Sequence, residues 1–289
     1  MNRLDPHPPS AIDNVRVSRE TFDSLYRDVG YTYEYVDGRV RISVAESALA
    51  VVAARTDRLR RLSGDHAGPG DLALMPAREV GRADLETAWL QAFTNAPEFY
   101  GYPITHLRER AKIQVANVFE ERVLGSHPVS VVLTHGEGIA GAVLVTTRTT
   151  RPVIEAAFVR RRLRRYGLGR LMLQRVGAHL HAGGIAVLCS YYHLANRASA
   201  KWHAALGFEE MPNWMLAARR YRCAVYNLRQ GWSRDVMATR RHVEALRQRK
   251  ISLRAASKED ELAASPHEWL QSHGDRIDAF ADRIWGDPR

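Results

Sequence analysis

The stretch VIEAAFVRRRLRRYGLGRLMLQRVGAHL, residues 153–180, joins two apolar patterns through a glycine-containing turn. Residues 151–159 form the continuous apolar run of a buried strand, whereas residues 167–182 have the apolar spacing of an amphipathic helix. The first amides of a helix have no partner inside it and carry partial positive charge, so they attract anions. Gly167 and Gly169 would let a phosphate approach those amides closely. The stretch therefore predicts a pyrophosphate site, although a plain tight turn would show the same spacing.

Arginine dominates this turn and the charge of the whole chain. Six arginines lie close together here: Arg160, Arg161, Arg162, Arg164, Arg165 and Arg170. Over the 289 residues, 42 Lys and Arg outnumber 32 Asp and Glu, which gives a net charge of +10. Guanidinium groups bind phosphate through paired hydrogen bonds, so the charge favours a phosphate-bearing partner. A GC-rich genome would produce the same arginine bias.

The overall composition is that of a folded globular protein. Apolar residues make up 45% and charged residues 26%, which excludes a disordered chain, a collagen and a coiled-coil rod. No window approaches the ~18 apolar residues of a membrane helix, and the N-terminus lacks the apolar core of a secretory signal. Cys189 and Cys223 lie in apolar, strand-like runs, which favours two buried free thiols over a bridge. These features predict a cytoplasmic protein without membrane contact.

Strand and helix patterns alternate on both sides of the opening stretch. Strands are predicted at 71–75, as a hairpin within 129–148, at 185–192 and twice within 209–228. Helices are predicted at 84–94, 104–123 and 197–205. This mixture predicts an α/β (α+β) fold with a central mixed β-sheet flanked by helices.

The two ends of the chain are predicted to form separate parts. A flexible tail is predicted at 1–15 and a small α/β-hairpin module at 16–62, with helices at 18–28 and 45–62 and a hairpin at 31–44. Asp37-Gly38 is the turn signal of that hairpin. Residues 63–71 have the composition of a linker, which leaves 72–228 as the main domain.

A helical C-terminal extension is predicted at 229–289, where the segments 231–250 and 257–285 are amphipathic and rich in arginine. Trp232, Trp269 and Trp285 lie on these segments. We expect the extension to pack on the core or on a second subunit, which would make the protein a homodimer.

Two motifs in the main domain are similar to those of a known family. The pattern V-x-x-x-x-R-x-x-G-x-G runs from Val159 to Gly169, and NRASAKWHAALGF follows at 196–208. Together they resemble the GNAT superfamily of acyl-CoA-dependent N-acyltransferases, over about residues 71–228. The resemblance implies a GNAT-like sheet that splays between two strands, where the pantetheine arm of CoA lies like an additional strand.

The resemblance also implies which residues bind the acyl donor, acetyl-CoA. The CoA pyrophosphate would lie on the turn formed by Arg164, Arg165, Tyr166, Gly167, Leu168, Gly169 and Arg170. Phe158 and Val159 would offer main-chain groups to pantetheine, and Asn196 would contact the same arm or the local backbone. A backbone N–H of the 155–159 strand would stabilise the oxyanion of the acyl carbonyl. No metal site is predicted.

His203 departs from the family pattern, which usually has tyrosine seven residues after the asparagine as acid to the leaving thiolate. Histidine can donate a proton, with an unperturbed pKa of about 6.5 that is closer to a thiol's value of about 8.5 than tyrosine's is. His203 could equally be a partly exposed helix residue without a role. Tyr191 and Tyr192, at the end of the preceding strand, are the nearest substitutes.

Glu155 is the candidate general base that removes a proton from the attacking ammonium. It is the carboxylate of the otherwise apolar strand PVIEAAFV and shares strand parity with Val153, Ala157 and Val159. A carboxylate inside a strand is costly unless it is solvated or paired. The alternative is therefore an ion pair with Arg148 or Arg151, and Glu137 in the preceding hairpin is a weaker second candidate.

The acceptor pocket of such a fold is built by the first two helices and their connection, here residues 89–110. The aromatic residues of this stretch are Trp89, Phe93, Phe99, Tyr100 and Tyr102, followed by His106. They suggest a flat or apolar acceptor, although core filling explains them equally well. Glu98 or Glu109 could hold a cationic amine, but a solvated helix charge explains them better.

These features together predict an N-acetyltransferase, EC class 2.3.1, that moves an acetyl group from acetyl-CoA to a primary amine. The amine could be carried on a nucleic acid or a basic protein. The alternative is a nucleic-acid or polyanion-binding protein with a degenerate acyltransferase core. The net charge, the missing tyrosine and the hairpin YEYVDGRVRIS, which resembles the start of an Uma2-type nuclease-like fold, favour that alternative.

Overall fold

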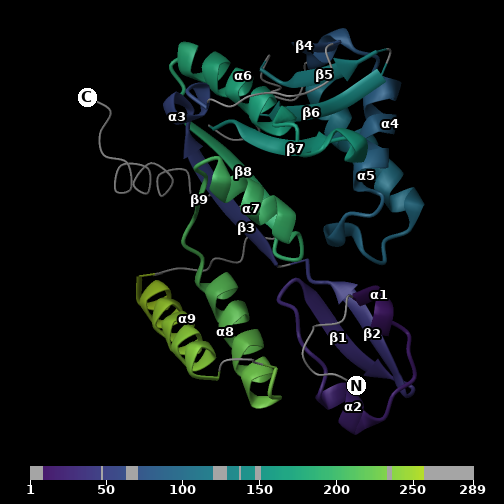
Figure 1. Cartoon of the computed structure of the whole chain (residues 1–289), viewed down its shortest axis with the longest axis vertical. Helices are drawn as coiled ribbons and strands as arrows, with labels where there is room; N and C mark the ends of the chain where they lie inside the picture. Colours follow the sequence, from purple (N-terminus) through teal and green to yellow (C-terminus); the bar gives the residue numbers. More distant parts are fainter. Residues whose placement is uncertain are drawn as a thin grey trace. The chain divides into compact units, whose positions relative to one another are not determined.

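A computed structural model describes most of the chain (Figure 1). The described residues are 9–46, 48–62, 71–119, 129–136, 138–146, 151–232 and 236–256. They form two compact units. The larger unit contains the described parts of 51–192 together with 198–211, and the smaller unit those of 9–50 with 193–197 and 212–256.

A seven-stranded mixed sheet forms the centre of the larger unit, in the order β4-β5-β6-β7-β8-β3-β9. The strands are β3 (Leu49–Arg55), β4 (Leu72–Pro76), β5 (Val131–His135), β6 (Gly138–Thr146), β7 (Val153–Val159), β8 (Val187–His193) and β9 (Glu209–Glu210). The run from β4 to β7 is antiparallel, β7 and β8 are parallel, and β9 pairs antiparallel with β3. This arrangement confirms the predicted fold class, a central mixed sheet flanked by helices.

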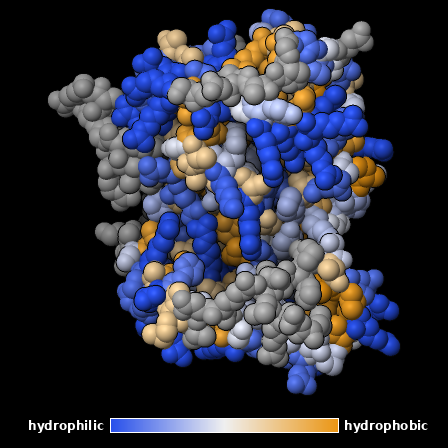
Figure 2. All heavy atoms as spheres, in the orientation of Figure 1, coloured by the Kyte–Doolittle hydropathy of each residue, from blue (hydrophilic) through white to orange (hydrophobic). Residues whose placement is uncertain are grey.

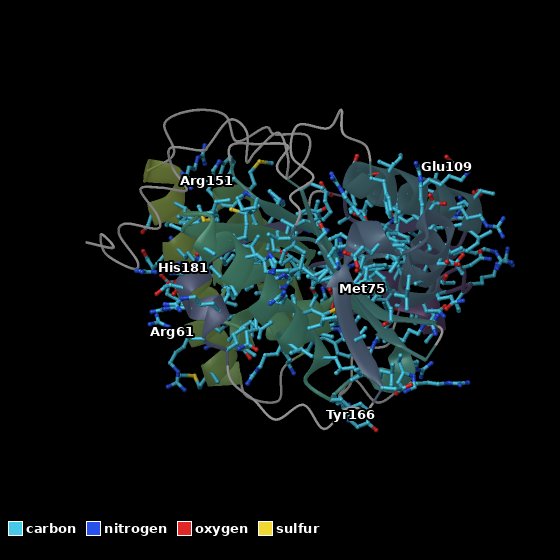
Figure 3. The ribbon with its side chains drawn as sticks, turned by 90° about the horizontal axis from the view of Figure 1, so that it is seen from above. Arg61, Met75, Glu109, Arg151, Tyr166 and His181 are labelled. Carbon is cyan, nitrogen blue, oxygen red and sulfur yellow. The ribbon has the colours of Figure 1, made fainter. Side chains whose placement is uncertain are left out.

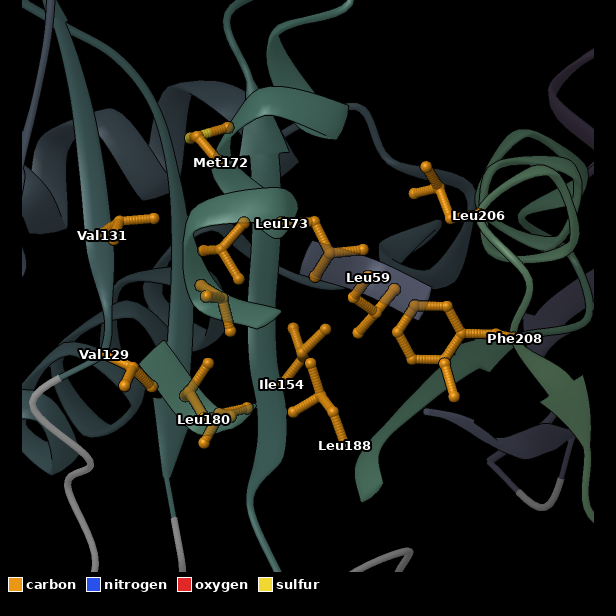
Figure 4. Packing of buried hydrophobic residues seen from close by; sticks show 14 of the residues in the cluster. Leu59, Val129, Val131, Ile154, Met172, Leu173, Leu180, Leu188, Leu206 and Phe208 are labelled. Atoms are coloured by element: carbon orange, nitrogen blue, oxygen red, sulfur yellow. The ribbon is translucent and has the colours of Figure 1, made fainter. Parts of the chain in front are cut away.

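Helices α6 (Leu168–Ala182) and α3 (Thr56–Arg60) pack on one face of this sheet. The apolar residues of α6 recur at helical spacing, and Met172, Leu173 and Leu180 are fully buried against strand residues (Figure 4). At Gly177 a side-chain Cβ would lie 2.5 Å from Cβ of Leu59, so glycine is what allows α3 to cross α6 closely.

Helices α4 (Arg82–Phe93) and α5 (Ile104–Phe119) cover the opposite face. Trp89 is buried there, and its ring N–H donates to Gln114 Oε1 at 2.8 Å, which satisfies the polar end of a large core residue. Two short 3-10 turns, Ala77–Glu79 and Pro97–Phe99, flank α4. The predicted helix at 104–123 is described as far as Phe119.

The prediction of a helix at 45–62 is wrong over most of its length. Residues 49–55 are strand β3, and only Thr56–Arg60 is helical. The alanine-rich run LAVVAAR is compatible with a buried strand or a buried helix, and its position between β8 and β9 selects the strand. The segment thereby joins the large sheet, so the compact units do not divide at the predicted linker, 63–71, of which 63–70 lies outside the described residues.

The smaller unit contains the predicted hairpin, formed by β1 (Tyr31–Val36) and β2 (Arg39–Val44). Asp37 and Gly38 both have positive φ, 50° and 77°, as the predicted turn requires. Two short helices precede it, α1 (Pro9–Ile12) and α2 (Arg19–Asp23), so the helix predicted at 18–28 is shorter than expected. Ser18 caps α2, because its Oγ accepts the Thr21 N–H at 3.1 Å.

The prediction of two strands within 209–228 is also corrected. Only β9 is extended, and α8 (Trp214–Arg229) follows it as a helix. Asn213 begins α8 by accepting the Leu216 N–H at 2.9 Å, and α9 (Val236–Ala256) packs alongside, with Lys250 lying 4.6 Å from the Tyr221 ring. The helical state of this segment depends on its packing against α9, and the sequence pattern of residues 209–228 did not reveal that packing.

Both cysteines are free thiols, as predicted. Cys189 is buried in β8, and burial raises the pKa of its thiol to about 12. Cys223 is half-buried and lies on α8, not on the expected strand.

Within the described part of the chain, no helix is both long and apolar enough to cross a bilayer. Parts of several predictions lie outside the described residues. These are most of the tail at 1–15, the hairpin residue Glu137, Arg148, and the extension beyond 256 with Trp269 and Trp285.

Candidate functional site

The parallel strands β7 and β8 open away from each other. Their register contains one pair, Val153 with Cys189, at the start of both strands, where the Cys189 N–H donates to Pro152 O at 2.9 Å. Towards their C-terminal ends the two ribbons diverge (Figure 1). Where two neighbouring strands diverge, their main-chain groups no longer pair with each other, and an extended ligand can pair with such groups as an added strand. This is the splay that the resemblance predicts.

The turn from β7 to α6 lies at the end of this opening. A short 3-10 turn, Arg161–Leu163, leads into it, and Arg165 and Gly167 both have φ of 73°, in the left-handed region. The Leu171 N–H donates to Gly167 O at 3.1 Å and closes the first turn of α6. By helix geometry the amides of residues 168–170 therefore have no acceptor within the helix. Such a concave group of amides is suited to an anion.

The side chains of the turn are mostly exposed. Tyr166 is 43% exposed and points away from the ribbon (Figure 3). Arg164 donates from Nε to the Val159 carbonyl at 3.0 Å, which fixes the start of the turn. The Leu168 side chain is buried in the core, so only the backbone of this residue is available to a ligand. The predicted arginines thus surround amides that already favour negative charge.

Gly169 has a packing role that the sequence pattern did not reveal. A Cβ placed on Gly169 would lie 3.0 Å from Nε1 of Trp202, on α7 (Arg197–Ala205). Glycine therefore lets α6 begin close to α7. Of the two glycines of the motif, Gly167 has the left-handed backbone and Gly169 provides the close approach.

Glu155 lies at an irregularity of β7. The register with β6 pairs Leu144 with Ala156 but Val145 with Ile154, so Glu155 is the extra residue of a β-bulge. The bulge reverses the alternation, because Ile154 packs on the α6 face whereas Ala156 packs on the face of α4 and α5. The sequence predicted that Glu155 faces the same side of the sheet as Ala157 and Val159. The bulge shows that this prediction is wrong.

The carboxylate of Glu155 is held by two hydroxyl groups. Its side chain is buried, with the residue 7% exposed. Oε1 accepts the Thr146 hydroxyl at 2.8 Å, and Oε2 accepts the Tyr191 hydroxyl at 3.3 Å. The structure thus brings a carboxylate and a phenol together where β7 and β8 begin to separate. The sequence missed this contact, because it depends on the bulge and on the register between distant strands.

His203 is buried, with 4% exposure, and both ring nitrogens are engaged. Nδ1 lies 2.8 Å from the Ser199 carbonyl, which can only accept, so Nδ1 carries the proton. Nε2 lies 2.9 Å from Ser190 Oγ and accepts its hydroxyl proton. Burial lowers the pKa of His203 to about 4. The residue is a neutral core histidine, not the partly exposed one that the sequence allowed.

The other predicted donor-binding residues lie on or next to these strands. The Phe158 ring packs 5.9 Å from that of Phe93, and its main chain pairs in register with Ala142 of β6, so a main-chain contact with a ligand stays a prediction. Val159 ends β7. Asn196 follows β8 in the smaller unit, and its backbone N–H donates to His193 O at 2.8 Å. A contact of Asn196 with pantetheine stays a prediction.

The aromatic stretch at 89–110 forms a connected cluster. Phe93 lies 4.5 Å from the Trp89 ring and 6.0 Å from Phe99, and Tyr102 stacks on His106 at 4.6 Å. Trp89 fills the core, whereas the outer members of the cluster are half-buried or exposed. Glu109 pairs with Lys112 at 2.9 Å on the surface of α5.

Comparison with known proteins gives likeness at the level of fold. No family model matches the chain, and no curated protein matches it. A GCN5-related N-acetyltransferase from Sphaerobacter thermophilus is 15% identical, with a TM-score of 0.41, over 56% of this chain and 48% of that one. A tandem GNAT protein of the clavulanic acid pathway is 18% identical, with a TM-score of 0.37, over 56% and 50%.

A third structure, a GCN5-related N-acetyltransferase from Kribbella flavida, is 12% identical, with a TM-score of 0.35, over 70% of this chain and 40% of that one. The chain therefore spans about half the length of these proteins or less. Every TM-score here is below 0.5, so these structures carry no argument about function.

Proposed function

We propose that the protein is a GNAT-type N-acetyltransferase, which moves an acetyl group from acetyl-CoA to a primary amine. One observation carries the proposal: the β7–β8 opening ends at a turn with two left-handed residues, from which the first amides of α6 project. CoA combines an extended arm with a pyrophosphate. The diverging ends of β7 and β8 would take up the arm, and the amides would take up the pyrophosphate.

The donor would be bound mainly by backbone groups. The amides of residues 165–170 would hold the pyrophosphate, and exposed arginines would add electrostatic attraction. The main chain of Phe158 and Val159 would pair with the pantetheine arm. Because backbone groups would make most of these contacts, the assignment does not depend on particular side chains at these positions.

Glu155 would act as the general base. An ammonium group has no lone pair to attack a thioester, so it must first lose a proton. The Glu155 carboxylate lies beside the opening and is fixed by Thr146, and a water molecule could carry the proton to it. A backbone N–H of β7 would stabilise the oxyanion as the amine adds to the acetyl carbonyl, and the CoA thiolate would then leave.

We assign His203 a positioning role instead of proton donation to the thiolate. Its single proton is directed at the Ser199 carbonyl, and its other nitrogen is occupied by Ser190. A group with this geometry links α7 to β8 but cannot release a proton without breaking a buried hydrogen bond. The free thiols of both cysteines support a location in the cytoplasm.

Calorimetric titration of the full chain with acetyl-CoA tests the proposal. Desulfo-CoA shares the pyrophosphate and the pantetheine arm and should bind similarly, whereas ATP lacks the arm and should bind at least tenfold more weakly. Micromolar binding would justify a screen of tyramine, spermidine, lysine and a lysine-containing peptide as acceptors. Absence of binding at millimolar acetyl-CoA would overturn the proposal.

A second candidate function, binding to a polyanion, is favoured by the helix pair α8–α9. The ten basic residues of the pair are Arg219, Arg220, Arg222, Arg229, Arg240, Arg241, Arg247, Arg249, Lys250 and Arg254, against one acidic residue, Glu244. Figure 2 shows patches of hydrophilic side chains with apolar ones between them. Steep salt dependence of RNA binding would support this function, either instead of acetyl transfer or as a means of holding an acceptor.

A further inference from the structure

Three arginine side chains line one open cavity within the smaller unit. The cavity has a volume of about 220 Å³. Its wall includes Arg27, Arg219 and Arg222 together with Tyr31, Tyr33 and Cys223, all of which belong to the smaller unit. Among the described residues that line it, none is acidic. The cavity therefore concentrates positive charge in a small space.

The cavity lies where α8 packs on the segment that leads into β1. Arg219 of α8 donates from Nε to the Val29 carbonyl at 2.6 Å and from Nη2 to the Tyr31 carbonyl at 3.0 Å. Asn227, also on α8, accepts the Arg27 backbone N–H at 2.8 Å and donates to the Arg27 carbonyl at 2.8 Å. These bonds fix the backbone of Arg27 and the side chain of Arg219 before any ligand binds.

The charge of these arginines is not balanced inside the cavity. Arg219 and Arg222 are three residues apart on α8, so the two like charges are neighbours on one helix face. Burial and the nearby charge of Arg222 lower the pKa of Arg219. The Asp28 carboxylate, which interacts with Arg219 electrostatically, already accepts the Gly30 N–H at 2.9 Å and an Arg197 N–H at 2.9 Å. A bound anion would relieve the repulsion between the arginines.

Arg27 has a donor that is not used within the described part of the chain. Its guanidinium lies 4.3 Å from the centre of the Phe22 ring, 4.8 Å from that of Tyr33 and 5.1 Å from that of Tyr226. Nη2 donates to the Phe22 carbonyl at 3.3 Å, but Nη1 is buried and has no acceptor among the described residues. A buried charged donor without an acceptor is costly and rare. The three rings account for the position of Arg27, and an anion beside it would supply the acceptor.

We propose that this cavity binds a phosphate monoester group. Such a group carries a charge of nearly −2 at neutral pH and three acceptor oxygens, which suits several guanidinium groups at once. The cavity is smaller than the ~300–1,000 Å³ of pockets that enclose a whole drug-sized ligand, so it fits the phosphate and the first atoms of its carrier. A small sugar phosphate and the 5′ end of an RNA both present this group. The inference is independent of acetyl transfer, because no residue named in the wall belongs to the proposed donor site.

Cys223 reports on the cavity directly. It is half-buried in the cavity wall, whereas Cys189 is fully buried, so iodoacetamide should label Cys223 first in the folded full chain. The probes are inorganic phosphate, ribose 5-phosphate and a 5′-phosphorylated RNA decamer. The controls are sodium acetate and the same RNA without its 5′ phosphate, all at one ionic strength. We expect a saturating phosphate probe to slow labelling, measured by mass spectrometry, at least about fivefold.

The same experiment separates the two sources of the phosphate. Protection by the RNA at concentrations about tenfold below those of ribose 5-phosphate would identify an RNA end as the ligand, because contacts beyond the phosphate would then add affinity. Equal protection by both would identify the phosphate group alone as the ligand. Equal protection by RNA with and without its 5′ phosphate, and none by the small probes, would overturn the proposal.

Calorimetry with ribose 5-phosphate tests the arginines without relying on the thiol. Arg222 is exposed, so Arg222→Gln should keep the fold, and Arg229→Gln removes the same charge from another exposed position of α8 outside the cavity wall. We expect Arg222→Gln to raise the Kd about tenfold, because a charge-assisted hydrogen bond is lost, and Arg229→Gln to change it less than about twofold. Equal Kd values in the two variants, or no heat of binding at millimolar ribose 5-phosphate in wild type, would overturn the proposal.

Discussion

The Nε2 atom of His203 lies 2.9 Å from Oγ of Ser190, and this hydrogen bond links helix α7 to strand β8 inside the core. Trp202, Tyr192 and Phe208 surround the imidazole with their rings. The position where the resemblance expects a tyrosine is thus occupied by a buried polar pair. Its contribution is to fix α7 and the strand that borders the opening.

The buried imidazole predicts a pH dependence of stability. Burial lowers the pKa of His203 from 6.5 to about 4, so the unfolded chain binds a proton at higher pH than the folded one. The stabilisation is complete above pH 6.5 and is lost as the pH falls towards 4, by about 3 kcal/mol in total. Urea unfolding of wild type at pH 7 and pH 4.5 should show this loss, and His203→Gln should show a smaller one.

The matched control for this effect is His181→Gln, at the exposed end of α6 (Figure 3). It should leave the difference between the two pH values unchanged. His193 contributes in the same direction as His203, because burial lowers its pKa as well, so some dependence remains in every variant. An identical pH effect in wild type and His203→Gln would contradict the assignment of a neutral, buried imidazole.

Glu155→Gln separates chemistry from binding. An amide keeps the size of the carboxylate and can accept the Thr146 hydroxyl, but it cannot take a proton from the acceptor amine. We expect turnover at pH 7 to fall about 100-fold, while the Kd for acetyl-CoA changes less than about threefold. Glu244→Gln, on the surface of α9, is the control. Equal losses in turnover and affinity would remove the base role from Glu155.

Gly167→Glu tests the pyrophosphate site. The substitution places a carboxylate at the start of α6, where it opposes an anionic ligand, and we expect the Kd for acetyl-CoA to rise about tenfold or more. Gly184→Glu is a close control, because Gly184 has a φ of 75° and open space around it, so backbone strain and charge are matched away from the site. Similar affinities of the two variants would contradict the site. Gly169 is unsuitable for this test, since any side chain there meets Trp202.

Local signals in the sequence were sufficient for the strand–turn–helix at 153–180 and for both hairpins. The apolar run before Gly167, the helical spacing after it and the Asp37-Gly38 turn each depend on neighbouring residues alone. The sequence mispredicted β3 as a helix and α8 as strands, because the elements that pack against these segments determine their secondary structure. β3 lies between β8 and β9 in the sheet, and α8 packs against α9.

The candidate site likewise combines features that neighbouring residues determine with contacts that depend on distant parts of the chain. The turn at 164–170 could be recognised from its glycines, and Glu155 from being a carboxylate in an apolar strand. The contacts of Glu155 could not be predicted from the sequence, because Thr146 and Tyr191 reach it only through the strand register and a bulge. The burial of His203 is likewise set by Ser190, thirteen residues earlier on another element.

The basic helices α8 and α9 give a prediction that is independent of acetyl transfer. Arg240 and Arg241 are exposed on α9, so replacing both with glutamine removes two potential phosphate contacts without disturbing a core. If these helices bind single-stranded RNA, the slope of log K against log salt should become shallower by about 1.4. Fluorescence anisotropy with a labelled 20-nucleotide RNA, titrated across a range of KCl concentrations, measures that slope.

Arg58→Gln with Arg108→Gln removes equal charge from exposed positions of α3 and α5 and should leave the slope unchanged. Equal slopes for the two double variants would show that α9 does not contact the RNA.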